Sequence, residues 1–268
     1  MTPPYPALPL YFSDTGNARS GAPTVVLLHS SVCDRRMWAP LLAALPPTYR
    51  GLAPDLRGFG DSTLDEDIPH DDARDVLRLL DGIGVERFAL VGSSYGGRVA
   101  LRIAGLVPER VQALVLLCPA APGLVETEAL AALAAREEEL VASGDLDGAC
   151  ALMADTWLGP DADASVRADV VRMQRRAYEV QLAAPEGSGR TEEGGPVPLS
   201  AVTAPTLVAT AAHDLPEFRA LAAGLPARLT GARETEYVDL RDTGHLPSVE
   251  RPEETTRLVR DFLGRSVK

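Results

Sequence analysis

Short runs of apolar residues recur through the first half of the chain, and stretches with apolar residues at helical spacing separate them. Such a run, often β-branched, predicts a strand that is buried on both faces of a sheet. The strand candidates are residues 24–28, 49–54, 88–91 and 111–117. The helix candidates between them are residues 31–45, 71–83 and 99–107. This alternation predicts a parallel sheet with helices on both of its faces.

The pattern changes in the middle of the chain. Residues 126–184 show only helical spacing, and residues 185–198 form a loop-like tract rich in Gly, Pro, Ser and Glu. Alternation then returns, with strand candidates at 205–210 and 235–240 and helix candidates at 217–223 and 252–263. We therefore predict a doubly wound, mostly parallel α/β core made of residues 1–118 and 199–268. The helical block, residues 119–198, is predicted to be an inserted lid over the C-terminal edge of the sheet.

Composition and charge narrow the class of protein. Of the 268 residues, 46% are hydrophobic, which is enough for a sizeable core. The formal net charge of -12 would repel a phosphate backbone, so we predict no nucleic-acid partner. No stretch reaches the roughly 18 apolar residues that span a bilayer, and the first residues lack the cationic and apolar regions of a signal peptide. We expect no membrane association.

The three cysteines, Cys33, Cys118 and Cys150, lie far apart and lack the spacing of metal ligands. We interpret each as a small apolar core residue, and we single out Cys33 because it lies near the proposed site. Cysteines without a pairing pattern indicate a reducing compartment, so a cytoplasmic location is predicted. The sequence has no dinucleotide-binding loop and no phosphate-binding loop. We therefore predict no cofactor and no metal.

A glycine-rich turn carries the strongest chemical signal of the chain. Gly92-Ser93-Ser94-Tyr95-Gly96-Gly97 follows the strand candidate 88–91 and precedes a helix candidate. A sharp strand-to-helix turn forces its middle residue into a strained backbone conformation, and the flanking residues must be small to avoid collisions. Gly92 and Gly96 meet that requirement and leave the Ser94 hydroxyl in the open. We predict that Ser94 is a nucleophile.

A serine hydroxyl needs a base to remove its proton, and the chain offers four histidines. His245 lies between the last predicted strand and the last predicted helix, at the C-terminal edge of the sheet, where α/β proteins gather their sites. We predict His245 as the general base. His29 ends a buried strand and is interpreted as structural, whereas His70 and His213 are interpreted as surface residues.

The base in turn needs a carboxylate that fixes its tautomer and stabilises its cation. Asp214 follows the strand candidate 205–210 by a short loop, again at the C-terminal edge. Asp239 and Asp242 are rivals because both lie near His245 in the sequence. Asp239 still belongs to a predicted strand and Asp242 is suited to capping a turn, so we predict Asp214 as the acid.

Charge that develops on an attacked carbonyl oxygen needs backbone N–H donors. One donor is predicted at Tyr95, the residue after the nucleophile, and the other at Ser31, in the loop after the first buried strand. The walls of the substrate pocket are predicted from residues near the proposed site on the core and the lid. They are Ser30, Met37, Trp38, Trp157 and Leu246.

Four motifs recur in an order that resembles the α/β-hydrolase superfamily. Residues 26–29 (VLLH) resemble the strand before the oxyanion loop, and residues 55–62 (DLRGFGDS) resemble the family's D-x-R-G-x-G-x-S turn. The other two are the nucleophile turn, residues 92–97, and the histidine loop, residues 244–247 followed by 250–253. The resemblance covers nearly the whole chain, and the nucleophile, acid and base follow one another in the family's order.

The subgroup that the chain resembles most is that of small lid-bearing esterases and enol-lactonase-like hydrolases. This resemblance implies a serine hydrolase that cleaves a small ester, lactone or related carbonyl substrate through an acyl-enzyme. Asp55 and Arg57 of the D-x-R-G turn are interpreted as structural, holding their loop by an ion pair and backbone hydrogen bonds. One departure is Ser30, which stands where the family usually has Gly and is expected to narrow the site.

Fold alone does not fix the reaction, so several alternatives stay open. The same triad and fold also serve C–C bond hydrolases, lyases, cofactor-free perhydrolases and natural-product cyclases. A non-catalytic ligand-binding receptor of the same fold is a further alternative. Three competent triad residues favour an enzyme that acts on a small-molecule substrate, and the oligomeric state stays open.

Overall fold

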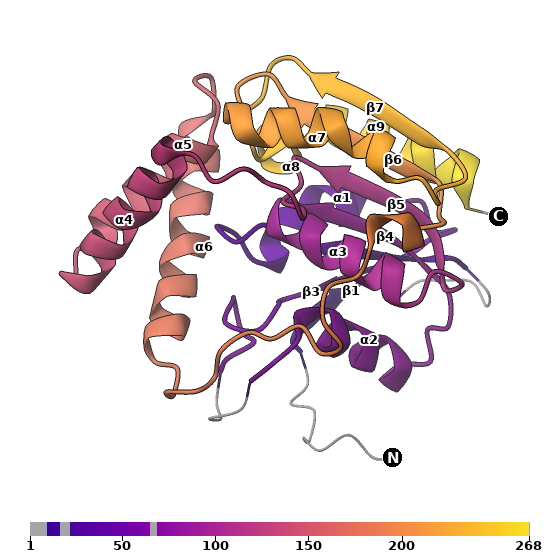
Figure 1. The fold of residues 1–268 in the computed structure, drawn as a ribbon, viewed down its shortest axis with the longest axis horizontal. Coiled ribbons are helices and arrows are strands. Elements are labelled where there is room, and N and C mark those ends of the chain that lie inside the picture. Colours follow the sequence, from indigo (N-terminus) through magenta and orange to yellow (C-terminus); the bar gives the residue numbers. More distant parts are fainter. Residues whose placement is uncertain (1–9, 17–21, 65–68, 268) are drawn as a thin grey trace.

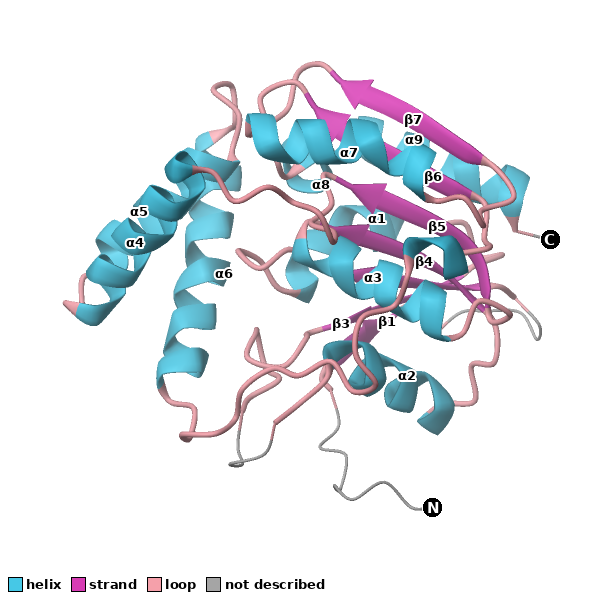
Figure 2. Cartoon of the chain, viewed as in Figure 1, coloured by secondary structure: helices cyan, strands magenta, loops and turns pink. Residues whose placement is uncertain are grey.

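A seven-stranded sheet occupies the centre of the computed structural model, which describes residues 10–16, 22–64 and 69–267 (Figure 1, Figure 2). The strands are β1 (Phe12–Asp14), β2 (Thr24–Leu28), β3 (Arg50–Pro54), β4 (Phe88–Ser93), β5 (Val111–Leu117), β6 (Thr206–Ala211) and β7 (Thr235–Leu240). They follow the order β1-β3-β2-β4-β5-β6-β7, and every neighbouring pair except β1 and β3 is parallel. The predicted doubly wound, mostly parallel α/β fold is thus confirmed.

The sequence pattern finds six of these strands and misses β1. That strand has three residues, none of them fully buried, and it runs antiparallel to β3 from Phe12↔Pro54 to Asp14↔Leu52. A strand this short gives too few positions for a periodic signal.

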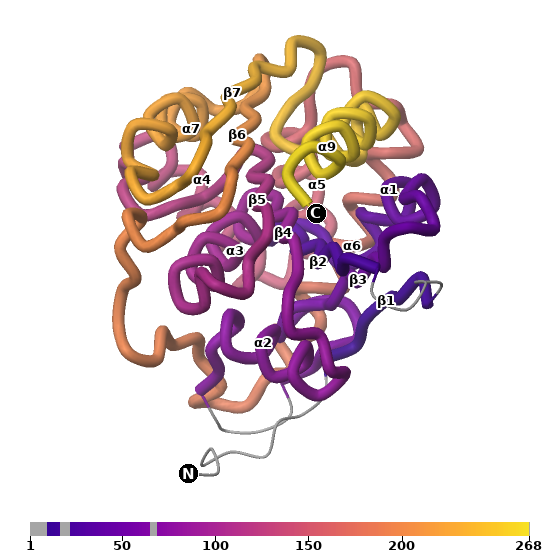
Figure 3. Tube along the Cα trace, turned by 90° about the vertical axis from the view of Figure 1, so that its right-hand side faces the viewer, coloured from indigo at the N-terminus to yellow at the C-terminus, as the bar shows by residue number. Residues whose placement is uncertain are grey.

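Side chains of the central strands alternate between two hydrophobic layers. In β4, Phe88 and Leu90 enter one layer, and Ala89 and Val91 enter the other. The first layer is covered by α2 (Asp72–Gly82), α3 (Tyr95–Leu106) and α7 (Pro216–Arg228), and the second by α1 (Ala39–Ala44) and α9 (Pro252–Ser266). These two groups of helices lie on opposite sides of the sheet in Figure 3. Short helices at η1 (Arg35–Trp38), η2 (Leu199–Ala201) and α8 (Pro247–Glu250) complete the core.

Parallel pairing brings the C-terminal ends of the strands to one edge of the sheet. Leu28 of β2 pairs with Gly92 of β4, and Ser93 of β4 pairs with Leu117 of β5. The loops that follow β4, β6 and β7 therefore begin close together, although they lie far apart in the sequence.

Three helices interrupt the alternation between β5 and β6: α4 (Glu128–Ala142), α5 (Leu146–Trp157) and α6 (Ala164–Leu182). They stand beside the C-terminal edge of the sheet, at the left of Figure 1. Residues 119–198 are described in full and contain no strand of the sheet. Val170 and Met173 of α6 join the second hydrophobic layer, whereas most of α4 is exposed and packs mainly against α5. The insertion is therefore fastened to the core chiefly through α5 and α6.

Residues 185–198, here called the strap, lead from α6 back to the core and run along α2 and α3 (Figure 1). The Gly189 carbonyl accepts from the His70 N–H at 3.1 Å, and the His70 carbonyl accepts from the Thr191 N–H at 2.7 Å. The His70 ring donates from Nδ1 to the Ser188 carbonyl at 3.0 Å. His70 is consequently buried, and its interpretation as a surface residue is wrong. The segment that covers it follows 118 residues later, so the local sequence gives no sign of it.

The expectation that the chain lacks a signal peptide concerns residues 1–9, which lie outside the described residues. Across the residues that are described, no helix combines the length and apolar character needed to cross a membrane.

Candidate active site

The turn between β4 and α3 holds Ser94 in a strained backbone conformation, with φ 50° and ψ -115°. A positive φ is uncommon outside glycine, and here it projects the side chain from the tip of the turn. Steric crowding requires glycine at the two flanking positions. A Cβ at Gly92 would lie 2.4 Å from the Gly96 carbonyl oxygen, and one at Gly96 would lie 2.1 Å from the Leu28 carbonyl oxygen. Crowding at both positions keeps the turn tight beneath Ser94.

Ser94, His245 and Asp214 form one line of hydrogen bonds at the C-terminal edge of the sheet. The Ser94 hydroxyl lies 2.7 Å from His245 Nε2, and His245 Nδ1 lies 2.8 Å from Asp214 Oδ1. This geometry suits a neutral imidazole that donates from Nδ1 to the carboxylate and accepts from the hydroxyl at Nε2. All three side chains are buried. The structure thus brings together the residues predicted as nucleophile, base and acid.

The rival carboxylates lie apart from this line. Asp239 and Asp242 are both exposed. Asp214 is instead fixed from two sides, because its Oδ1 also accepts from the Leu215 N–H at 2.7 Å. His213, the neighbour of Asp214, is exposed, in agreement with its interpretation as a surface residue.

Glu250 is a buried carboxylate that the sequence reasoning missed as a functional residue. Its Oε2 accepts from the Gly244 N–H at 3.0 Å and from the Gly159 N–H at 2.8 Å. Nearby, the His245 N–H donates to the Trp157 carbonyl at 2.9 Å. The loop after α5 is therefore fastened directly to the loop that carries His245, the proposed base. We call this set of bonds the clasp.

Two aromatic rings flank the His245 imidazole. The Trp157 ring centroid lies 4.4 Å from it at an interplanar angle of 42°, and the Phe218 centroid lies 4.6 Å from it at 79°. Trp157, predicted as a pocket wall, thus contacts the proposed base itself. Phe218 gives no distinct signal in the sequence, because an apolar residue at helical spacing is typical of any core. Both rings restrict the imidazole to the orientation that meets Ser94 and Asp214.

The predicted oxyanion donors lie at the start of α3 and on the loop after β2. Tyr95 is the first residue of α3, so its N–H has no acceptor within that helix. A Cβ at Gly96 would lie 2.6 Å from the His29 carbonyl oxygen, which shows how closely α3 approaches the loop that carries Ser31. His29 is buried, and its Nδ1 donates to the Ser30 carbonyl at 2.8 Å. This contact fits the interpretation of His29 as a structural residue.

The other predicted pocket residues, Ser30, Met37, Trp38 and Leu246, are all buried. The Ser30 N–H donates to Met37 Sδ at 3.4 Å, and the Ser30 hydroxyl has no hydrogen-bond partner among the described residues. The described non-glycine residues with positive φ do not include Ser30. The serine therefore needs none of the conformational freedom of a glycine at this position, and its effect is one of added volume.

Among the described residues, one set of three metal-ligating side chains comes together, with ligand atoms of Cys118, Asp214 and His245 within 4.8 Å of one another. Both nitrogens of His245 are engaged, one by Ser94 and the other by Asp214. Burial raises the pKa of the Cys118 thiol well above its usual range, and the Asp214 carboxylate raises it further. A metal would need the thiolate and a free ring nitrogen. The arrangement favours a hydrogen-bonded triad over a metal centre.

The D-x-R-G turn is held by the ionic and backbone bonds that its residues were expected to make. Asp55 contacts the Arg35 guanidinium and accepts from the Asp61 N–H at 2.9 Å. Arg57 pairs with Asp75. These contacts fit a structural role for Asp55 and Arg57.

The inserted helices rest on the same turn. Arg176 of α6 donates from Nε to the Gly60 carbonyl at 2.9 Å, and Gln181 donates to the Gly58 carbonyl at 3.1 Å. The insertion is thus attached at both ends of α6, since the loop before that helix belongs to the clasp.

Comparison with known proteins shows that the chain belongs to one family. Residues 25–258 match the model of the Alpha/beta hydrolase family. A 2-hydroxymuconate semialdehyde hydrolase of Pseudomonas sp. (strain CF600) is 38% identical over 101 residues, which are 36% of this chain and 35% of that protein. 3-Oxoadipate enol-lactonase 1 of Acinetobacter baylyi is 37% identical over 86 residues, 32% of each protein. The matched stretch thus spans about a third of the length of these curated relatives.

Among solved structures, a thermophilic esterase from Thermogutta terrifontis aligns with a TM-score of 0.77 at 26% identity. The alignment covers 97% of this chain and 94% of the esterase. The likeness therefore includes the inserted helices as well as the sheet and its flanking helices.

Proposed function

Because the chain belongs to the Alpha/beta hydrolase family, we propose that it is a serine hydrolase that cleaves small esters or lactones through an acyl-enzyme. The observation that carries the proposal is the unbroken hydrogen-bonded line from Ser94 through His245 to Asp214. A hydroxyl, an imidazole and a carboxylate at these distances are the parts of an activated nucleophile.

In the first half-reaction, the Ser94 oxygen bonds to the carbonyl carbon of the substrate while its proton passes to His245 Nε2. The Asp214 carboxylate stabilises the imidazolium that forms. The N–H groups of Tyr95 and Ser31 donate to the negatively charged carbonyl oxygen. The imidazolium then protonates the departing alcohol oxygen as the ester C–O bond breaks, which leaves the acyl group on Ser94.

In the second half-reaction, a water molecule takes the place of the alcohol. His245 removes a proton from the water as its oxygen attacks the acyl carbon, and the same proton passes to the Ser94 oxygen as the acyl bond breaks. The products are the carboxylic acid and the regenerated serine. With a lactone, the alcohol and the acid remain parts of one molecule.

We assign residues 119–198 as a lid on a core of residues 1–118 and 199–268. Two contacts support this role: the Trp157 ring lies against His245, and the clasp at Glu250 ties the loop after α5 to the histidine loop. The inserted helices thus contribute to the wall around the base. Exclusion of water at that wall strengthens the charge interactions on which the triad depends.

Small, neutral acyl groups are the substrates that we propose. Ser30 adds a buried hydroxyl to the same loop that carries Ser31. The rings of Trp157 and Phe218 give the base an apolar surrounding, which suits an uncharged substrate. The similar proteins described as an esterase and an enol-lactonase are named for the cleavage of an ester and of a lactone, the two bond types proposed here.

The proposal is tested by labelling with a fluorophosphonate and by release of p-nitrophenol from its acetate ester. The wild type is expected to take one label and to turn over the ester, and Ser94→Ala is expected to do neither. Ser93→Ala is the matched control, because it removes a buried hydroxyl from the neighbouring residue. Labelling that persists in Ser94→Ala and disappears in Ser93→Ala would move the nucleophile to Ser93. A wild type that takes no label and releases no phenol would favour a binding protein of this fold.

A further inference from the structure

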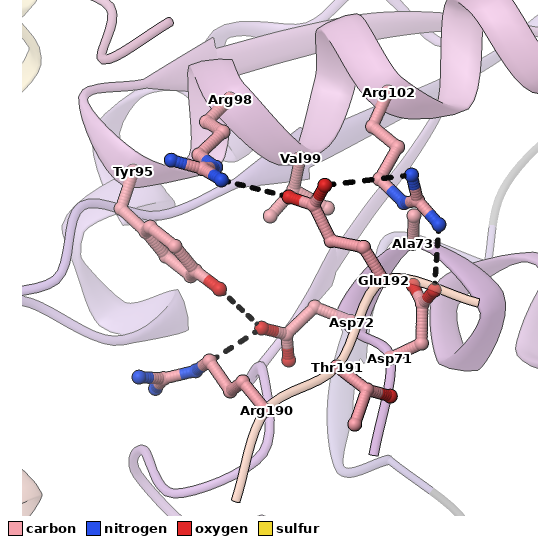
Figure 4. A pocket seen from close by; sticks show the side chains of 10 residues that line it. All are labelled: Asp71, Asp72, Ala73, Tyr95, Arg98, Val99, Arg102, Arg190, Thr191 and Glu192. Carbon is pink, nitrogen blue, oxygen red and sulfur yellow. Dashed lines mark hydrogen bonds and ion pairs between the residues drawn. The ribbon is translucent and has the colours of Figure 1, made fainter. Parts of the chain in front are cut away.

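The side chain of Tyr95, the residue after Ser94, lines the pocket shown in Figure 4. Its hydroxyl donates to Asp72 Oδ2 at 2.5 Å. Asp72 is the first residue of α2, and its side chain is only 4% exposed. The residue that follows the nucleophile is thus hydrogen-bonded to a buried carboxylate on a different helix.

Arg190 of the strap completes this arrangement from the other side. Its Nε lies 3.3 Å from Asp72 Oδ2, and its guanidinium lies 5.1 Å from the Tyr95 ring centroid (Figure 4). The same guanidinium lies 5.3 Å from the ring centroid of Phe59, in the D-x-R-G turn. A cation over two aromatic faces and beside a carboxylate has three favourable contacts. The strap is therefore linked to Tyr95 directly and through Asp72.

The Tyr95 ring packs against the first hydrophobic layer but is only partly buried. A cavity of about 250 Å³ lies beside it, lined by residues of α2, α3 and the strap. A side chain next to open space can change rotamer unless a polar contact holds it. Burial raises the pKa of Tyr95 well above its usual value, and the Asp72 carboxylate raises it further, so the hydroxyl stays protonated. The hydrogen bond to Asp72 therefore anchors the tip of the ring, in addition to the Arg190 guanidinium that lies over its face.

We propose that Tyr95, Asp72 and Arg190 form a positioning relay that aims the Tyr95 backbone N–H at the carbonyl oxygen of the substrate. This proposal rests on the proposed function, in which that N–H binds the developing negative charge. An oxyanion donor is effective only when it points to the place where the charge forms. Anchoring the Tyr95 ring restricts rotation of the residue that carries the donor. Asp72 and Arg190 are thus positioning residues that act without touching the substrate.

The decisive variant is Tyr95→Phe, which removes only the hydroxyl. We expect kcat for p-nitrophenyl acetate to fall about tenfold, because loss of a whole oxyanion donor costs roughly 10²–10³ and a misdirected donor costs part of that. KM should stay nearly constant, since the contact strengthens in the transition state. The affinity for a boronic acid that mimics the tetrahedral intermediate should fall by a similar factor.

Tyr178→Phe is the matched control. The Tyr178 hydroxyl donates to Glu137 Oε1 at 2.7 Å within the inserted helices, and Tyr178 is buried, whereas Tyr95 is partly buried. Its loss removes the same kind of phenol–carboxylate bond far from the nucleophile turn. We expect unchanged kcat and boronate affinity, with a thermal midpoint lowered as much as in Tyr95→Phe. Equal losses of kcat in the two variants would overturn the relay, because a general loss of stability would then explain both.

Variants of Asp72 separate the hydrogen bond from the charge. Asp72→Asn keeps an acceptor for the Tyr95 hydroxyl, so it should retain more activity than Asp72→Leu. Adding Tyr95→Phe to Asp72→Leu should cost nothing further, since both changes break one bond. Arg190→Ala should lower kcat less than Tyr95→Phe does. Fully additive effects of Tyr95→Phe and Asp72→Leu would contradict the relay.

Ester hydrolysis and phosphonate labelling of the wild-type protein distinguish a wrong relay from a wrong proposed function. If the wild type neither hydrolyses the ester nor takes the phosphonate label, the proposed function falls and the relay falls with it. If the wild type does both while Tyr95→Phe keeps its kcat and boronate affinity, the relay alone is overturned.

Discussion

The two flanks of Ser94, the proposed nucleophile, are built from different kinds of contact. The side of His245, the proposed base, is here called the base flank, and the side of Tyr95, the proposed oxyanion donor, is called the oxyanion flank. On the base flank, His245 is held by the buried carboxylate of Asp214, by the clasp at Glu250 and by two aromatic rings. On the oxyanion flank, Tyr95 is anchored to Asp72, which pairs with Arg190, a strap residue whose side chain is 43% exposed. One flank is closed off from solvent, and the other depends partly on a segment that solvent reaches.

This difference has an energetic consequence. Removing one partner of a buried hydrogen-bonded group leaves the other unsatisfied and costs the full desolvation penalty. An ion pair with an exposed member contributes little, because solvent and salt screen it. Single substitutions on the base flank should therefore cause large losses of kcat or stability, whereas single substitutions on the oxyanion flank should cause small ones.

The largest expected effect lies on the base flank. Asp214→Asn should lower kcat by roughly 10⁴, since the amide disfavours the tautomer in which Nδ1 carries the proton. His245→Ala should lower kcat at least as far, because no base then takes the Ser94 proton. Steady-state hydrolysis of p-nitrophenyl acetate measures both. Asp239→Asn is the control, because Asp239 is an exposed carboxylate near the C-terminal end of β7, and it should be close to wild type. An inactive Asp239→Asn beside an active Asp214→Asn would transfer the acid role to Asp239.

The next effect concerns the clasp. Glu250→Gln replaces a carboxylate that accepts from three N–H groups, those of Gly159, Gly244 and Leu246, with an amide that also carries donors. The free energy of unfolding should fall by about 1–3 kcal/mol, as measured by urea denaturation. The value of kcat should fall about tenfold because the histidine loop loses its fixed position.

Glu253→Gln, an exposed change in the same motif, should alter neither quantity. A Glu250→Gln protein with reduced stability and full kcat would show that the clasp supports the fold alone.

Much of this architecture follows from local sequence. The apolar runs of β2 and β5 can only belong to a sheet that is covered on both faces, and the structure buries nearly all of their residues. The glycines around Ser94 are equally informative, because crowding at a strand-to-helix turn is a local property. These elements could be predicted because their cause lies within a few residues of chain.

The missed features depend on partners that arrive from distant segments. Gly159 and Glu250 are 91 residues apart, and His70 and Ser188 are 118 apart. Neither contact produces a periodic pattern in the sequence from which it could be predicted. Glu250 resembles any acidic residue near a helix start, and His70 resembles a surface histidine beside two aspartates. Only the topology, which sets the inserted helices and the strap against the core, shows the contacts that these two residues make.

A smaller effect is expected on the oxyanion flank at Ser30. Ser30→Gly removes a buried hydroxyl that has no hydrogen-bond partner among the described residues, and it demands no change of backbone φ. The freed volume should favour larger acyl groups, so the ratio of kcat/KM for hexanoyl and acetyl esters should rise about fivefold. Ser93→Ala removes another buried, unpartnered hydroxyl and should leave the ratio unchanged. A constant ratio in Ser30→Gly would show that Ser30 does not limit the acyl group.

The smallest expected effect is a pH dependence of stability at the strap. Burial lowers the pKa of His70, and the Arg190 guanidinium lowers it further against the opposing influence of Asp72. In the unfolded chain, a histidine titrates near about 6.5. Above that pH, His70 is neutral in both states and its contribution to stability is fully present. As the pH falls below it, the unfolded chain binds the proton first, so stability decreases until the pH passes the lowered pKa of the folded state.

His70→Gln removes this titration while keeping a donor for the Ser188 carbonyl. The decrease in thermal midpoint between about pH 7 and pH 5.5, a window set by the unfolded histidine pKa, should therefore be shallower in the variant than in the wild type. A residual slope is expected, because burial also lowers the pKa of His29. His213→Gln, at an exposed histidine, should keep the wild-type slope. If His70→Gln keeps the wild-type slope as well, proton uptake at His70 does not govern the stability of the protein in this pH window.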